Sequence, residues 1–71
     1  MSKNVYIRGY SSTDQGKVLE MAAQIQQKLG LPAKAFYFPE QNEQGYWSVL
    51  IRCSEGVSEL EMRARVAWAT R

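Results

Sequence analysis

The sequence predicts an α/β fold of the two-layer α+β type, with the order strand, helix, strand, strand, helix. Three observations predict it: two segments alternate between apolar and polar residues, two others repeat apolar residues at helical spacing, and turn-forming residues separate them. With a right-handed crossover, both helices cover one face of a three-stranded sheet. The 71 residues are enough for a single domain, 1–71, with a thin core.

Residues 4–10 have the period of a half-buried strand. Val5 and Ile7 are expected to face the helices, whereas Tyr6, Arg8 and Tyr10 face the other way. The following residues, 11–14, offer several helix N-caps, and Ser12 with Gln15 has the spacing of a capping box.

A helix is the clearest prediction for the segment that ends before Gly30. Gly30 suits a left-handed C-terminal cap, and Pro32 prevents the helix from continuing. Its apolar residues fall in one stripe that faces the core: Val18, Met21, Ala22, Ile25 and Leu29.

Two further strands are expected at residues 34–38 and 46–53, joined by a polar hairpin loop at 39–45. In the second of them Trp47, Val49, Ile51 and Cys53 share one face. The opposite face carries Tyr46, Ser48, Leu50 and Arg52.

The last helix begins after Ser58, which forms a capping box with Glu61. It has two apolar stripes on opposite sides, and a domain of this size has no third layer to cover both. One stripe is therefore expected to remain exposed unless a second chain buries it. We assign self-association, as a homodimer, to Met62 and Val66; the alternative is that such residues are tolerated singly on the surface. The stripes are Leu60, Ala64, Ala67, Trp68 and Met62, Val66, Ala69.

Residue types for catalysis are scarce. The chain has no histidine and one cysteine, which excludes an internal disulfide and disfavours zinc. Glu59 and Glu61 each precede an arginine by four residues, which is typical of a solvated helix face. Cys53 fits a small residue at a strand end better than a nucleophile. We expect no enzyme, no catalytic residues, no cofactor and no metal.

A phosphate loop is a weak alternative for residues 9–18. Six residues separate Gly9 from Gly16 where a Walker A loop has four, and Val18 stands where a magnesium-binding Ser or Thr belongs. A capped helix start explains this segment more simply.

The N-terminal residues contain no apolar run of signal-peptide length, and no segment has the roughly 20 apolar residues of a membrane span. With a free cysteine, this favours a cytoplasmic protein that does not bind membranes. The net charge of +2 does not by itself indicate nucleic acid.

The sheet face away from the helices carries the functional prediction. Tyrosine and arginine are enriched in protein interfaces, so we expect a protein partner to bind there. The same residue types can stack bases and hold phosphates, so a single-stranded nucleic-acid binder is the alternative, and cross-strand pairing that only stabilises the sheet is a third interpretation. The strand at 34–38 adds either Tyr37 or Phe36 and Phe38 to this face. The partner-binding residues are predicted to be Tyr6, Arg8, Tyr10, Tyr46 and Arg52.

The order of elements resembles that of small bacterial and phage-borne regulators with a βαββα domain, such as the DinI-like proteins. The likeness is one of topology, because Arg63, Arg65 and Arg71 stand where that group has an acidic C-terminal helix. No residue or activity is carried over. The sequence as a whole predicts a small non-enzymatic regulator or inhibitor, of the kind found as bacterial or phage accessory proteins, that acts by covering a partner's surface.

Overall fold

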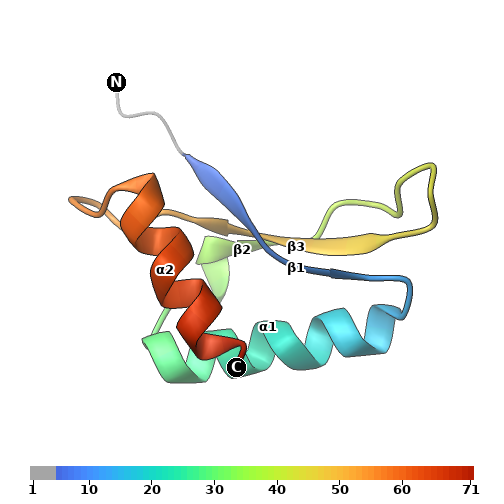
Figure 1. Ribbon diagram of the computed structural model, residues 1–71, viewed down its shortest axis with the longest axis horizontal. Helices are drawn as coiled ribbons and strands as arrows, with labels where there is room; N and C mark the ends of the chain where they lie inside the picture. The colour runs from blue at the N-terminus through green and yellow to red at the C-terminus, as the bar shows by residue number, and fades with distance from the viewer. Residues whose placement is uncertain (1–4) are drawn as a thin grey trace.

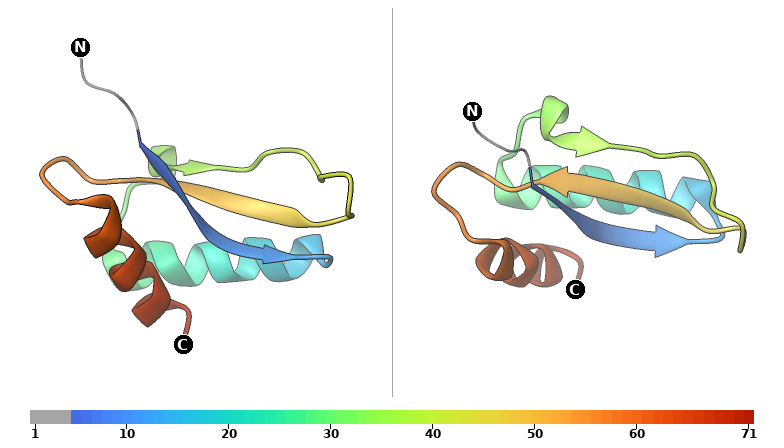
Figure 2. Two further views of the ribbon diagram at one scale, coloured as in Figure 1. Left: turned by 45° about the horizontal axis from the view of Figure 1, so that its top comes forward. Right: turned by 90° about the horizontal axis from the view of Figure 1, so that it is seen from above.

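Strand β3 (Trp47–Arg52) is the central strand of a three-stranded antiparallel sheet in the order β1-β3-β2. The computed structural model describes residues 5–71. Strands β1 (Tyr6–Ser12) and β2 (Phe36–Tyr37) flank β3, and helices α1 (Gln15–Leu29) and α2 (Glu59–Ala69) lie on one side of the sheet (Figure 1). This arrangement confirms the predicted fold class. Seen from above, the sheet lies in front of α1, and α2 lies beside the β1 edge (Figure 2).

Helix α1 forms where the apolar stripe predicts it. Gly30 caps its C-terminus with a φ of 65°, in the left-handed region that favours glycine. Its N-cap is Asp14, one of the candidates at residues 11–14, and not Ser12 of the expected capping box. The Asp14 side chain accepts a hydrogen bond from the backbone N–H of Lys17. Ser12 remains in β1, and its hydroxyl accepts from the backbone N–H of Asp14. The strand therefore runs directly into the helix cap.

Strand β2 is shorter than the predicted strand at 34–38. A 3₁₀ turn, η1 (Ala33–Ala35), takes up the first part of that segment and buries Ala35. The two residues that remain in the strand pair with β3, Phe36 opposite Ile51 and Tyr37 opposite Leu50. This register settles the open question of the sequence, because Phe36 packs against the core and Tyr37 takes the opposite face.

A β-bulge at Gly9 interrupts the pairing of β1 with β3. Arg8 pairs with Leu50, but Tyr10, two residues later, pairs with the next residue of β3, Val49. The extra residue reverses the alternation of faces beyond the bulge. Tyr10 consequently packs against the core on the helix side. The prediction that Tyr10 faces away from the helices is therefore wrong.

The core lies between the sheet and the two helices. Isoleucines and valines of β1 and β3 meet the stripe of α1 there, as predicted. Its buried residues are Ile7, Val18, Ala22, Ile25, Val49, Ile51, Met62, Val66 and Ala69.

Helix α2 contributes to this core the stripe that the sequence analysis assigned to self-association. Met62 is 1% exposed and Val66 is 4% exposed, so neither offers surface to a second chain. That assignment is wrong. The rotation of α2 about its own axis, where it packs against β1 and α1, decides which stripe is buried. Both stripes are apolar enough to enter the core. The other stripe faces solvent, with Leu60 79% exposed.

The caps and charges of α2 agree with the sequence. The Ser58 hydroxyl accepts from the backbone N–H of Glu61. The predicted ion pairs form with the correct spacing, Glu59 with Arg63 at 2.8 Å and Glu61 with Arg65 at 3.7 Å. Within residues 5–71, no helix is both long enough and apolar enough to cross a membrane.

Candidate functional site

The sheet surface opposite the helices brings together aromatic, apolar and cationic side chains from all three strands. Because Ile7, Ile51 and Phe36 face the core, the strand alternation turns their neighbours to the other side. We call this surface the outer face and define it by the residues before the bulge and their partners: Tyr6, Arg8, Tyr37, Leu50 and Arg52.

Two tyrosines meet across the central strand. Tyr6 lies on β1 opposite Arg52, and Tyr37 lies on β2 opposite Leu50. Their ring centroids are 6.5 Å apart with an interplanar angle of 64°, an edge-to-face contact. Tyr6 is 41% exposed and Tyr37 is 56% exposed, so the pair forms an aromatic platform above β3 that stays accessible to a partner.

The charge of the outer face is entirely positive. Arg8 is exposed and Arg52 is partly buried, and the face as defined contains no acid. Both ion pairs found among the described residues lie on α2, so neither Arg8 nor Arg52 forms a salt bridge with residues 5–71. Their guanidinium groups remain available for carboxylates of another molecule.

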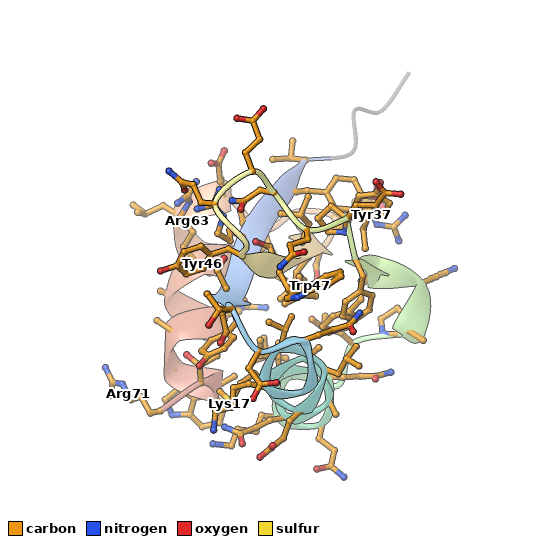
Figure 3. The ribbon with its side chains drawn as sticks, turned by 90° about the vertical axis from the view of Figure 1, so that its right-hand side faces the viewer. Lys17, Tyr37, Tyr46, Trp47, Arg63 and Arg71 are labelled. Atoms are coloured by element: carbon orange, nitrogen blue, oxygen red, sulfur yellow. The ribbon has the colours of Figure 1, made fainter. Side chains whose placement is uncertain are left out.

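Tyr46 is exposed as predicted but lies at the other end of the sheet. It precedes β3, and Asn42 holds it in the hairpin loop through hydrogen bonds in both directions. It lies six positions before Arg52, about 20 Å along an extended strand. Figure 3 shows Tyr46 projecting sideways, away from Tyr37, whereas Trp47 lies between the sheet and α1. Tyr46 is therefore not part of the outer face.

Of the five predicted partner-binding residues, the structure brings together Tyr6, Arg8 and Arg52. Tyr10 lies on the helix side and Tyr46 lies apart. Tyr37 and Leu50 complete the cluster. The alternation of residues in β3 already predicted that Leu50 faces away from the helices. The side taken by Tyr37 depends on the residue at which η1 ends, and the aromatic residues at 36–38 do not reveal that residue.

Between the aromatic platform and Tyr46 the outer side of the sheet is polar. The hydroxyl groups of Ser11 and Ser48, which are paired across β1 and β3, form a hydrogen bond of 2.9 Å. This serine pair separates the aromatic platform from Tyr46.

Cys53 follows β3 and lines an open cavity of about 600 Å³ with residues of the β3–α2 loop and of the segment after α1. Burial raises the pKa of its thiol, the Glu59 carboxylate raises it further, and Arg63 acts in the opposite direction. The thiol is therefore less ionised at neutral pH than an ordinary cysteine, which makes it a weaker nucleophile. This environment fits a structural role for Cys53.

The start of α1 is the region that resembled a phosphate loop. Its free backbone N–H groups attract anions, but the Asp14 carboxylate already accepts from the N–H of Lys17 at 3.3 Å. In the part of the chain described, residues 5–71, no three Cys, Asp or Glu side chains gather in a way that could hold a metal ion.

Known proteins offer no guide to this face. Comparisons with protein-family models, with curated proteins and with solved structures find no match. The chemistry of the outer face is therefore the basis for proposing a function.

Proposed function

We propose that the chain is a non-enzymatic protein-binding module, a small cytoplasmic regulator or inhibitor that covers a surface of a partner protein with its outer face. The observation that carries the proposal is the Tyr6–Tyr37 platform, flanked by two arginines without ion-pair partners in residues 5–71. Tyrosine and arginine are the residue types that contribute most to binding energy at protein interfaces.

The chemistry of the face defines the partner. Tyr6, Tyr37 and Leu50 offer a continuous apolar and aromatic surface in the middle, and Arg8 and Arg52 add positive charge without a compensating acid. The complementary surface is an apolar patch bordered by aspartate or glutamate, since arginine binds carboxylates through two parallel hydrogen bonds.

Single-stranded nucleic acid is the second candidate, because aromatic rings beside arginines can stack bases. The edge-to-face geometry of Tyr6 and Tyr37 counts against it, since rings inclined at 64° do not present parallel stacking surfaces. Only two cations lie on the face, and the net charge of the chain is +2. These two observations favour a protein partner.

Charge reversal tests the proposal directly. The variant Arg8→Glu/Arg52→Glu is expected to lose at least about tenfold in affinity for the partner captured from the native host, because both carboxylate contacts become repulsive. The matched control Lys17→Glu/Lys34→Glu makes the same change in net charge at exposed positions that are not part of the outer face. Binding of the purified partner is measured by isothermal titration calorimetry.

The control variant should bind the partner as the unmodified chain does. Equal losses in both double variants would show that net charge and not the outer face governs binding, and unchanged binding by Arg8→Glu/Arg52→Glu would remove the proposal. A fluorescein-labelled single-stranded oligonucleotide titrated at two salt concentrations tests the other candidate. Tight binding that weakens steeply with salt, and that only the outer-face variant loses, would replace the protein partner with nucleic acid.

A further inference from the structure

Helix α2 presents an apolar stripe that its own chain does not cover. Leu60 is 79% exposed and Trp68 is 54% exposed, and Ala64 and Ala67 between them are also exposed. The four residues follow one another at intervals of four, three and one, so they lie on the side of α2 opposite the buried Met62. A single exposed leucine is ordinary, but a continuous apolar stripe along three turns is typical of a helix that packs against another helix.

The stripe is self-complementary in shape. Its large residues, Leu60 and Trp68, each stand four positions from the small central residue Ala64. If a second copy of α2 crosses the first in the opposite direction at Ala64, Leu60 of one copy lies beside Ala67 and Trp68 of the other. The small side chains at the centre then permit close approach of the two backbones, while the large ones pack at both ends.

The charges on α2 are self-complementary in the same direction. Glu59 and Glu61 lie in its first turn and pair with Arg63 and Arg65 in its middle. Arg71 follows the last residue of α2, so it lies at the opposite end from the two glutamates. In Figure 3, Arg71 points away from the body of the domain on the α2 side. Two antiparallel copies place the acidic first turn of one helix near Arg71 of the other, whereas two parallel copies place the two acidic turns together. Opposed helix dipoles favour the same arrangement.

Helix α1 strengthens this asymmetry at the C-terminal end of the stripe. The Lys28 ammonium group lies 5.6 Å from the centroid of the Trp68 ring, a cation–π contact that places another positive charge beside the stripe. The acidic first turn of a second α2 would lie against this end. The apolar stripe and its surrounding charges therefore fit one occupant, a second copy of the same helix.

We propose that the chain forms a two-fold homodimer in which two α2 helices pack antiparallel through Leu60, Ala64, Ala67 and Trp68. Because α2 lies on the helix side of the sheet, as Figures 1 and 2 show, this contact leaves the outer face of both copies uncovered. The dimer thus presents two outer faces and gains avidity for a partner with repeated binding surfaces. The dimer itself does not depend on the proposed function, since it uses different residues.

The stripe is short, so the dimer is expected to be weaker than complexes that bury roughly 1,600 Å². Sedimentation equilibrium from low micromolar to near-millimolar concentration should show the average mass rise from the monomer toward the dimer. The variant Leu60→Glu/Ala64→Glu should stay monomeric over this range. The control Leu19→Glu introduces a negative charge at an exposed leucine of α1 and should associate like the unmodified chain.

A monomer at every concentration would overturn the proposal, as would an equal loss of association in the Leu19→Glu control. Far-UV circular dichroism verifies that each variant is folded. The orientation is tested by disulfide cross-linking in a Cys53→Ser background. A Leu60→Cys chain mixed with an Ala67→Cys chain should cross-link to form heterodimers, while each chain alone should not. Cross-linking of each chain with itself would indicate parallel helices and contradict the antiparallel dimer.

Discussion

Met62→Ala should lower the free energy of unfolding by about 2–5 kcal/mol, because it removes a fully buried side chain and leaves a cavity between α2 and the sheet. A chain of 71 residues has a total stability of only roughly 4–10 kcal/mol at about 0.05–0.15 kcal/mol per residue. The variant therefore loses a large share of what holds it folded. Urea unfolding followed by circular dichroism measures the change.

Leu60→Ala is the matched control, since it changes a residue of similar size on the same helix, two positions away. Leu60 is 79% exposed, so its loss should change the stability of the monomer by no more than about 0.5 kcal/mol. Both variants are measured at low micromolar concentration, where the α2 dimer does not form. If Leu60→Ala were the more damaging change, the rotation of α2 about its axis would be reversed and the exposed stripe would be Met62 and Val66.

Gly9→Ala should lower the stability by about 1–3 kcal/mol, through overpacking and not through backbone strain. A Cβ at this position would lie 2.5 Å from Cδ1 and 3.2 Å from Cγ1 of Ile51, and 3.4 Å from a methyl group of Val49. Ile51 and Val49 are themselves fully buried, so they have little freedom to move away. Denaturant unfolding measures the loss.

The comparison variant for this change is Gly16→Ala, in the exposed first turn of α1. There the added Cβ meets only the Asp14 carboxylate, at 3.3 Å, and alanine is a better helix former than glycine. Its effect should stay within about 1 kcal/mol. A loss at Gly9 no larger than that at Gly16 would mean that the bulge does not bring β1 as close to β3 as the structure shows.

Beyond Gly9, the alternation of residues in the sequence no longer predicts which side chains of β1 face the helices. Period-two alternation correctly placed Tyr6, Ile7 and Arg8, and it failed at Tyr10 because a bulge inserts one residue and exchanges the faces. The glycine itself was the available signal, since an isolated glycine inside a strand pattern indicates a bulge or a close backbone approach. The same reasoning turns Ser11 to the outer side, where it bonds to Ser48.

In the helices, features that depend on neighbouring residues were predictable from the sequence, and features that depend on tertiary contacts were not. The stripe of α1, its Gly30 cap and the ion pairs of α2 depend on residues close in sequence, and the pattern predicted them. Which stripe of α2 enters the core depends on contacts with distant residues, such as the hydrogen bond from the Gln24 amide to the carbonyl of Ala69. Helical periodicity contains no information about that choice, so Met62 was placed on the wrong side.

The part of the candidate site that lies on β1 and β3 was predictable from the sequence. Tyr6, Arg8 and Arg52 lie together as expected because the pairing of these two strands fixes their face. The side taken by Tyr37 depends on the end of η1, a 3₁₀ turn that takes up the first two residues of the expected strand at 34–38. Tyr46 is exposed as expected, but the pattern of faces does not reveal that it belongs to the hairpin loop at the other end of the sheet from Arg52.

The central claim is that the outer face is what a partner covers, and tyrosine nitration read by mass spectrometry tests it most directly. In the free chain Tyr6, Tyr37 and Tyr46 should react with tetranitromethane faster than the partly buried Tyr10. In the complex with the captured partner, Tyr6 and Tyr37 should be protected while Tyr46 reacts at its free rate. Nitration of Tyr6 and Tyr37 at undiminished rates in that complex would contradict the account.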